Sequence, residues 1–104
     1  MVLSNTIKRV NKVCDEIKRG RNKYPNCNEV YLFGSFLYKE VSNDIDILVV
    51  YEDSECDINT QLDMLSTIVE TVSNLPVDMT ALSKGEMKEI SFLNRVYPRY
   101  IRVI

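Results

Sequence analysis

The sequence predicts an α/β (α+β) domain in which a small mixed β-sheet carries helices packed on it. Apolar residues recur at three- and four-residue steps in some segments, as in amphipathic helices, and form short runs in others, as in strands. The order of these segments is typical of a sheet covered by helices. It runs helix 5–18, strand 29–33, strand 44–51, helix 58–73, strand 77–82 and a last helix from residue 84.

Length and composition fit a single domain. The chain has 104 residues, 45% of them hydrophobic and 27% charged, which is ordinary for a globular protein that folds without disulfide or metal staples. The net charge of −2 and the pI of about 5.1 argue against a general affinity for nucleic acid, which needs a basic face. We therefore expect one domain over residues 1–104 and at most a local contact with nucleic acid.

Cysteine usage and the N-terminus indicate the compartment. Cys14, Cys27 and Cys56 have no short metal-type spacing, and the chain has no His to complete a zinc site. The first six residues turn polar almost at once, unlike a signal peptide, and no apolar run approaches membrane-spanning length. We expect a cytoplasmic protein with reduced thiols and no membrane contact.

The first helix begins at Ser4 or Asn5, either of which can cap it. Its predicted apolar stripe consists of Ile7, Val10, Cys14 and Ile17. Gly20 ends the helix, and the loop that follows is locally basic because of Arg19, Arg21 and Lys23. This loop is either a solvated turn or a surface that helps to hold a triphosphate or an acidic partner.

The strand at residues 29–33 ends at Gly34 and Ser35, where the backbone can pass close to a ligand. The N–H groups that follow, together with the Ser35 hydroxyl, can cradle a phosphate where a short helical turn begins at Phe36. Most Gly-Ser pairs are simple turns, so this pair gains its weight from the Asp-x-Asp that follows. Gly34 and Ser35 are therefore candidate phosphate-binding residues.

The strand at residues 44–51 carries two carboxylates on one face. Side chains alternate across a strand, so Asp44 and Asp46 point the same way, with Cα atoms roughly 6.6 to 7 Å apart. Like charges this close repel and lose hydration unless a cation lies between them, and Mg²⁺ prefers such oxygen ligands. The continuous apolar end predicts a central strand covered on both faces. A strand-entry turn is the alternative, but it accounts for Asp44 and not for Asp46.

The second half begins with an acidic loop at residues 52–55, which we interpret as solvated. Asp57 can cap the next helix, whose methionine and leucine positions we assign to the core. Its apolar stripe is Ile58, Leu62, Leu65, Ile68 or Val69, and Val72. In the strand at 77–82, Asp78 is the only charge and either lies on the buried side with a partner or faces water on an edge strand.

Ser83 and Glu86 have the capping-box spacing that opens a last helix, with apolar residues at helical intervals from Met87 to Val96. Pro98 stops this helix. The tail, residues 97–104, adds either an edge strand or a partner-facing surface.

Three separated elements, in this order, resemble the signature of the DNA polymerase beta nucleotidyltransferase superfamily, particularly its minimal nucleotidyltransferases of the MntA-like antitoxin type. They are Phe33-Gly34-Ser35, Asn43-Asp44-Ile45-Asp46 and Val77-Asp78-Met79-Thr80. The resemblance covers the chain from residue 29 onward and implies a single nucleotidyltransferase domain. It implies that Asp44, Asp46 and Asp78 are catalytic and bind metal, with two Mg²⁺ ions. It also implies that Gly34 and Ser35 hold the phosphates of ATP or another nucleoside triphosphate.

The linker at residues 36–43 departs from the family pattern, which is longer and carries an Arg. Lys39 is its only basic residue, and it either takes over a phosphate contact or is simply solvated. This departure leaves open how the substrate is handled.

The resemblance implies a metal-dependent transfer of a nucleoside monophosphate, AMP from ATP, to a hydroxyl acceptor, such as a tyrosine of a HEPN-type toxin partner. Since the chain has no room for an acceptor-binding module, we expect a separate protein partner or a homodimer. The alternative is a non-catalytic nucleotidyltransferase-like binding protein, or an antitoxin that acts by steric inhibition. Modification of a small hydroxylated molecule fits less well, because such enzymes usually carry an extra domain.

Overall fold

A computed structural model describes the backbone of residues 5–52, 57–90 and 100–104, and the side chains of these ranges except 88–90. Within these ranges the chain forms a four-stranded mixed sheet in the order β3-β2-β1-β4. β1 is antiparallel to β2 and β4, and β2 is parallel to β3. The elements are α1 (Asn5–Arg19), η1 (Arg21–Lys23), β1 (Cys27–Phe33), η2 (Ser35–Leu37), β2 (Ile45–Tyr51), α2 (Ile58–Ser73), β3 (Val77–Ser83), α3 (Lys84–Ile90) and β4 (Tyr100–Arg102). The predicted fold class and the order of its helices and strands are confirmed.

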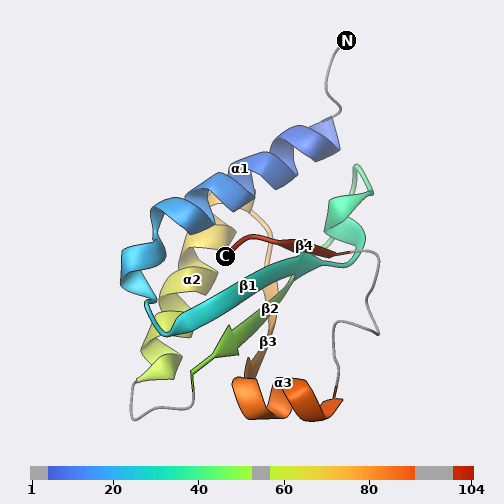
Figure 1. Ribbon diagram of the computed structural model, residues 1–104. Helices are drawn as coiled ribbons and strands as arrows, with labels where there is room; N and C mark the ends of the chain where they lie inside the picture. The colour runs from blue at the N-terminus through green and yellow to red at the C-terminus, as the bar shows by residue number, and fades with distance from the viewer. Residues whose placement is uncertain (1–4, 53–56, 91–99) are drawn as a thin grey trace.

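The helices divide between the two faces of the sheet (Figure 1). α1 and α2 pack on one face, where their apolar residues enclose the main core with Val30, Leu32 and Ile47 of the sheet. On the other face, Met87 of α3 packs against a smaller cluster that includes Leu48 and Val50. β2 is therefore covered on both faces, as predicted for a central strand.

α1 begins at Asn5, but its buried stripe differs from the predicted one. Val10 and Ile17 are buried as expected, whereas Ile7 is 47% exposed and Cys14 is only half-buried. The central position belongs to Val13, which is 1% exposed. Ile7 and Cys14 lie one residue, or about 100°, further round the helix than Thr6 and Val13. The sheet thus meets α1 on a slightly rotated face, which the spacing of the apolar residues alone does not fix.

β1 begins at Cys27, two residues earlier than the alternation predicted. Cys27 pairs with Tyr51, but the register shifts between Cys27 and Glu29. A shift of this kind is a bulge, and it breaks the alternation of side chains by which a strand is recognised in a sequence. The turn before it contains the short helix η1 and the buried Tyr24.

The predicted capping residues are found at the helix ends. The Asp57 side chain accepts a hydrogen bond from the Thr60 N–H at the start of α2, and Asn74 ends that helix in the left-handed region at φ 57°. Ser83 and Glu86 form the predicted capping box, with hydrogen bonds of 3.0 and 3.2 Å between their side chains and backbone N–H groups. Met64 is 42% exposed, so its assignment to the core of α2 is wrong. It lies beside the buried Leu65 in sequence, about 100° round the helix.

In the described part of the tail, residues 100–102 form the edge strand β4, as one of its two interpretations predicted. Ser4, residues 53–55, Cys56 and the last helix beyond Ile90 with its stop at Pro98 lie outside the described residues. Among the helices described, none is both long and apolar enough to cross a membrane.

Candidate metal centre

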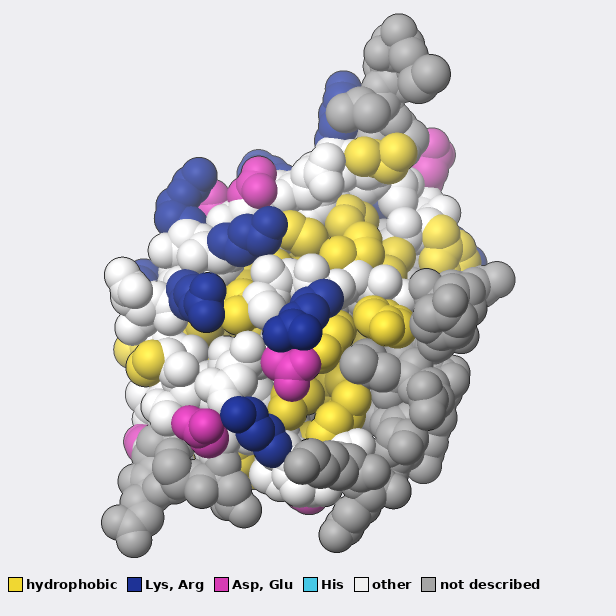
Figure 2. Space-filling model, in the orientation of Figure 1, with side chains coloured by type: hydrophobic (Ala, Val, Ile, Leu, Met, Phe, Trp, Pro, Cys, Tyr) yellow, Lys and Arg dark blue, Asp and Glu magenta, His cyan; other side chains and the backbone are white. Residues whose placement is uncertain are grey.

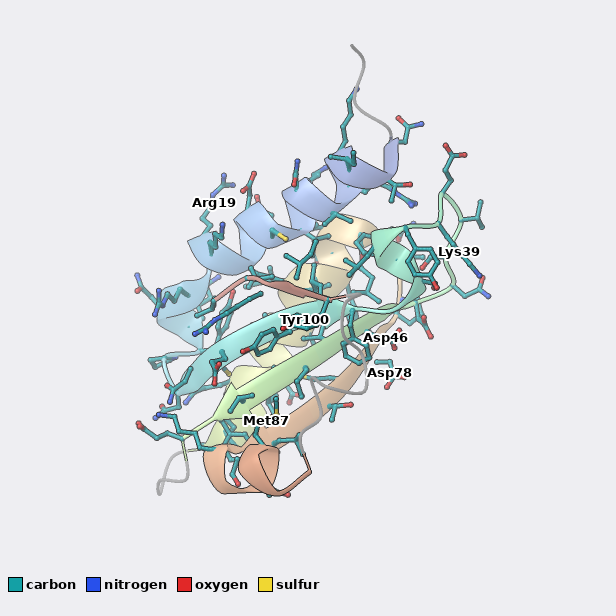
Figure 3. All side chains as sticks on the ribbon, turned by 45° about the vertical axis from the view of Figure 1, so that its right-hand side comes forward. Arg19, Lys39, Asp46, Asp78, Met87 and Tyr100 are labelled. Carbon is teal, nitrogen blue, oxygen red and sulfur yellow. The ribbon has the colours of Figure 1, made fainter. Side chains whose placement is uncertain are left out.

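Three carboxylates meet at one end of the sheet, on the face that carries α3. Asp46 lies in β2, Asp44 directly precedes that strand, and Asp78 lies in β3 in register with Asp46. One carboxylate oxygen from each residue lies within 4.8 Å of the others. Figure 3 shows Asp46 and Asp78 side by side on the neighbouring strands. The structure thus brings together the three acidic residues that were separated by up to 34 positions in the sequence.

Parallel pairing of β2 with β3 produces this arrangement. The Ile45 N–H donates a 3.0 Å hydrogen bond to the Pro76 carbonyl, which joins the first residue of β2 to the residue directly before β3. Ser42 Oγ donates to the Asp44 carbonyl at 2.7 Å and fixes the approach to β2. Because partners in a ladder point to the same face, Asp46 and Asp78 must project together. Asp78 was predicted to lie either on the buried side or on a water-facing edge strand. It is exposed on the edge strand β3, yet it still faces the other carboxylates.

The electrostatics of Asp46 reflect this crowding. Burial raises the pKa of the Asp46 carboxyl above its ordinary value, and the charges of Asp44 and Asp78 and a hydrogen bond with Asp78 raise it further. Ionising all three side chains therefore has a free-energy penalty that a cation between them would remove. A set of three carboxylate oxygens matches a hard divalent cation such as Mg²⁺ rather than zinc or copper. The residues present thus fit the metal that the sequence implied.

The position of the Asp46 carboxylate explains why residue 34 is a glycine. The Gly34 φ of 82° lies in the region that L side chains rarely adopt, and a Cβ at this position would overlap the Asp46 carboxylate. β1 pairs Phe33 with Asp46, so the chain leaves the strand directly over that side chain. The sequence predicted a close approach between the Gly34 backbone and a ligand. The structure places the Asp46 carboxylate at that close approach.

Residues 34–39, named here the Gly-Ser turn, fold tightly after β1. Leu37 N–H donates to the Gly34 carbonyl at 3.2 Å, while the N–H groups of Tyr38 and Lys39 donate to the Ser35 carbonyl at 3.1 and 2.9 Å. The predicted helical turn at Phe36 is thus confirmed as η2. Lys39 is exposed and lies at the same end of the molecule as Asp46 and Asp78 (Figure 3). Whether Gly34, Ser35 and Lys39 contact phosphate stays a prediction.

The basic residues Arg19, Arg21 and Lys23 lie away from the carboxylates. η1 precedes Cys27, at the opposite end of β1 from Phe33 and its partner Asp46, which is roughly 20 Å for six residues of extended chain. Arg19 pairs with Glu16 at 2.6 Å. Figure 2 shows Lys and Arg side chains spread over α1 and the adjoining turn on this face. A triphosphate at the carboxylates would be out of their reach, which argues against a role of this loop in holding one, whereas contact with an acidic partner stays a prediction.

Arg9 is a residue that sequence reasoning missed. It was assigned to the polar side of the first helix, but its guanidinium lies over the Phe36 ring and donates to the Lys39 carbonyl. The available signal was its position beside Val10, at the border of the apolar stripe. That signal does not reveal which segment a border residue contacts.

A family model matches most of the chain. Residues 15–96 match the model of the family described as "Polymerase beta, Nucleotidyltransferase". No curated protein matches the sequence.

Solved structures match the fold at low sequence identity. One is the complex of a tri-AMPylated Shewanella oneidensis HEPN toxin with MNT antitoxin, with 22% identity, a TM-score of 0.55, and coverage of 92% of this chain and 71% of that chain. Another, from Sulfolobus solfataricus and described as a candidate nucleotidyltransferase, has 23% identity, a TM-score of 0.53 and coverage of 97% and 87%. A toxin–antitoxin structure with AMP-PNP has 19% identity, a TM-score of 0.54 and coverage of 97% and 73%.

Proposed function

The chain belongs to the polymerase beta nucleotidyltransferase family, and from that premise we propose that it transfers a nucleoside monophosphate, AMP from ATP, to a hydroxyl acceptor. The observation that carries this proposal is the meeting of Asp44, Asp46 and Asp78 within 4.8 Å. Three carboxylates at that spacing repel one another and serve no packing purpose at an exposed sheet end. Their placement supports a reaction that uses bound divalent cations.

Asp44 and Asp46 would hold Mg²⁺, and Asp78 would complete a second site. Held there, Mg²⁺ would neutralise the charge that develops on the attacking oxygen and on the departing pyrophosphate. Asp78 has a further task because it is the most exposed of the three and can meet an incoming acceptor. Its carboxylate would accept the proton of the acceptor hydroxyl as that oxygen bonds to the α-phosphorus and the bond from the α-phosphorus to the pyrophosphate oxygen breaks.

The Gly-Ser turn would hold the β- and γ-phosphates. Ser35 lies one residue after the glycine that overhangs Asp46, so a triphosphate bound to the turn reaches the carboxylates with its α-phosphate. The Ser35 hydroxyl and the N–H groups at the start of η2 are suitable donors. Lys39, on the same turn, would add a positive charge near the γ-phosphate. Positioning and charge neutralisation are the main contributions that a protein makes to such a transfer.

For the acceptor we propose a tyrosine of a separate HEPN-type protein. The AMPylated HEPN toxin in the Shewanella oneidensis complex supports this choice, since a chain of that complex shares this fold. The toxin–antitoxin structure that contains AMP-PNP supports an adenine nucleotide as the donor. A homodimer is the other assembly that would supply an acceptor-binding surface.

A non-catalytic antitoxin that blocks a partner sterically is the second candidate. One observation favours it: the only basic residue between Ser35 and Asp44 is Lys39, so phosphate handling differs from the family pattern. The full carboxylate set argues for transfer, because steric inhibition needs no metal.

Label transfer separates the two candidates. The protein is incubated with Mg²⁺, α-phosphate-labelled ATP and a lysate of its source cells, beside the Asp44→Ala and Asp46→Ala variants and an Asp63→Asn control. Asp63 is an exposed acid of α2, outside the carboxylate group. We expect label on a macromolecule with the wild type and the control but not with the two site variants. Absence of label with the wild type, together with no Mg²⁺-dependent binding of ATP, leaves the steric mechanism.

A further inference from the structure

Arg9 connects α1 to the Gly-Ser turn. Its Nη2 donates a hydrogen bond to the Lys39 carbonyl at 3.0 Å, and its Cζ lies 5.4 Å from the centre of the Phe36 ring. Phe36 is 2% exposed and is anchored in the main core. One guanidinium therefore contacts both the buried and the exposed part of the turn.

The contact acts on the residue that closes the turn. Lys39 N–H bonds to the Ser35 carbonyl, and the Lys39 carbonyl bonds to Arg9. A chain of hydrogen bonds thus runs from α1 through Lys39 to Ser35. The Ser35 carbonyl belongs to a peptide group at the start of η2. A movement of residue 39 away from α1 would therefore change the direction of the N–H groups there, which are proposed phosphate donors.

The Arg9 guanidinium contacts a carbonyl and an aromatic ring, neither of which carries a full negative charge. Within the described residues, Arg9 forms no ion pair, and its Nε is buried without a hydrogen-bond partner. A small cavity of about 120 Å³ adjoins it, lined also by Lys12, Val13, Phe36, Val72 and Ser73. Simple packing against Phe36 would be served equally by an apolar side chain, without the penalty of burying a donor. The guanidinium instead contacts the Gly-Ser turn from the side of α1.

We infer that Arg9 is a positioning residue that holds the Gly-Ser turn in its phosphate-receiving shape. This inference rests on the proposed function, because it assigns the nucleotide phosphates to that turn. Arg9 touches neither the carboxylates nor the proposed position of the phosphates. It acts through the Lys39 carbonyl and the Phe36 ring.

The first test uses the protein without nucleotide. Amide hydrogen exchange is compared for the wild type, Arg9→Met and Arg9→Lys, with Lys12→Met as the matched control. Lys12 lines the same cavity but, within the described part of the chain, forms no hydrogen bond or ion pair with the turn. We expect exchange at Leu37, Tyr38 and Lys39 to quicken roughly tenfold in Arg9→Met, the loss of one hydrogen bond to a charged group. Exchange in β1 and β2 should stay unchanged.

The second test separates binding from chemistry in the full reaction. For Arg9→Met we expect KM and the Kd for MgATP to rise roughly tenfold while kcat changes by less than about threefold, because the same interaction is lost in ground and transition states. Arg9→Lys keeps the charge and a donor, so it should recover part of the affinity. Lys12→Met should match the wild type.

The outcomes are distinguishable. Faster exchange confined to the turn, with a selective rise in KM, supports the positioning role. Unchanged exchange, a fall in kcat at constant KM, or an equal effect of Lys12→Met overturns it. A wild type that neither binds MgATP nor transfers label overturns the proposed function. In that case the positioning role falls with it, and the exchange data assign Arg9 to structural anchoring alone.

Discussion

The two halves of β2 differ in what their side chains contact. Toward its end, Leu48 and Val50 are fully buried against Tyr31 and apolar residues of β3 and α3. At its start, on the same face, Asp46 lies among other carboxylates and its pKa is raised. The packed half supplies stability, and the acidic half reduces it unless a cation binds. A strand that is central to the core can therefore hold a repulsive site in place without unfolding.

The largest effect on activity should come from Asp46→Asn. The amide keeps the shape of the side chain but removes the charge, so we expect label transfer to fall by about a hundredfold or more. In metal-free protein the same change should leave the melting temperature unchanged or raise it, because one repulsive charge is gone. Label transfer and thermal melts with and without Mg²⁺ measure both effects. A strongly destabilised metal-free variant would show that Asp46 is a structural residue.

The largest effect on stability should come from Leu48→Ala, two residues further along the strand. Leu48 has no exposed surface, and its truncation should reduce the free energy of unfolding by about 2–5 kcal/mol. Chemical denaturation measures this loss. At temperatures where the variant is folded, its KM for MgATP should equal that of the wild type. A loss of Mg²⁺ binding by folded Leu48→Ala would contradict the division between the two halves.

Gly34→Ala should affect both regions. The new Cβ overlaps Asp46 and the positive φ is strained, so we expect a loss of about 1–3 kcal/mol in stability and weaker Mg²⁺ binding. Gly85→Ala is the control, because among the described residues an added Cβ there meets only Ser83 Oγ at 3.9 Å, and Ala favours a helix. Denaturation and Mg²⁺ titration of both variants test this. Equal stability of the two variants would refute the overlap.

Lowering the pH should weaken Mg²⁺ binding, because the raised pKa of the Asp46 carboxyl makes it bind a proton more readily. The folded, metal-free protein holds this proton at a higher pH than the unfolded chain does, so the penalty from ionised Asp46 disappears as the pH falls through the raised pKa. Protons and Mg²⁺ then compete for one carboxylate. Calorimetric titrations of Mg²⁺ repeated at successively lower pH should show growing proton release on binding. Asp46→Asn should abolish that release.

The smallest effect should come from Tyr31→Phe in β1, beside the packed half of β2. Tyr31 donates a 2.6 Å hydrogen bond to Glu29, and burial followed by this bond raises its pKa to about 12. Since the unfolded chain loses this proton near the ordinary tyrosine pKa of 10.0, the wild type should lose stability as the pH rises from 10.0 toward 12. Tyr31→Phe should lack this decline and cost about 1 kcal/mol at neutral pH. Chemical denaturation of both proteins, at neutral pH and between pH 10.0 and 12, is the measurement.

The fold and the acidic residues of the site were accessible from local patterns. Asp57 and Asn74 bound α2 where capping residues and αL geometry predict, and the alternation of Asp44 and Asp46 with Ile45 marks one strand face. Features that depend on docking were not accessible. Ile7 has core spacing but is exposed, because the core meets α1 on a neighbouring face, and Met64, assigned to the core as a methionine, lies off the buried stripe of α2. The bulge that extends β1 to Cys27 was hidden because it interrupts the alternation.

The sequence by itself determined the element order, the helix caps and the chemistry of the acidic residues, since these depend on neighbours a few positions away. Only the tertiary structure decided that Asp78 joins Asp46, that Gly34 overhangs Asp46, and that Arg9 reaches the Lys39 carbonyl. These contacts join residues 12 to 32 positions apart, counting from Gly34 to Asp46 and from Asp46 to Asp78. Strand register and helix docking create them, and both follow from the packing of the whole core rather than from any local pattern.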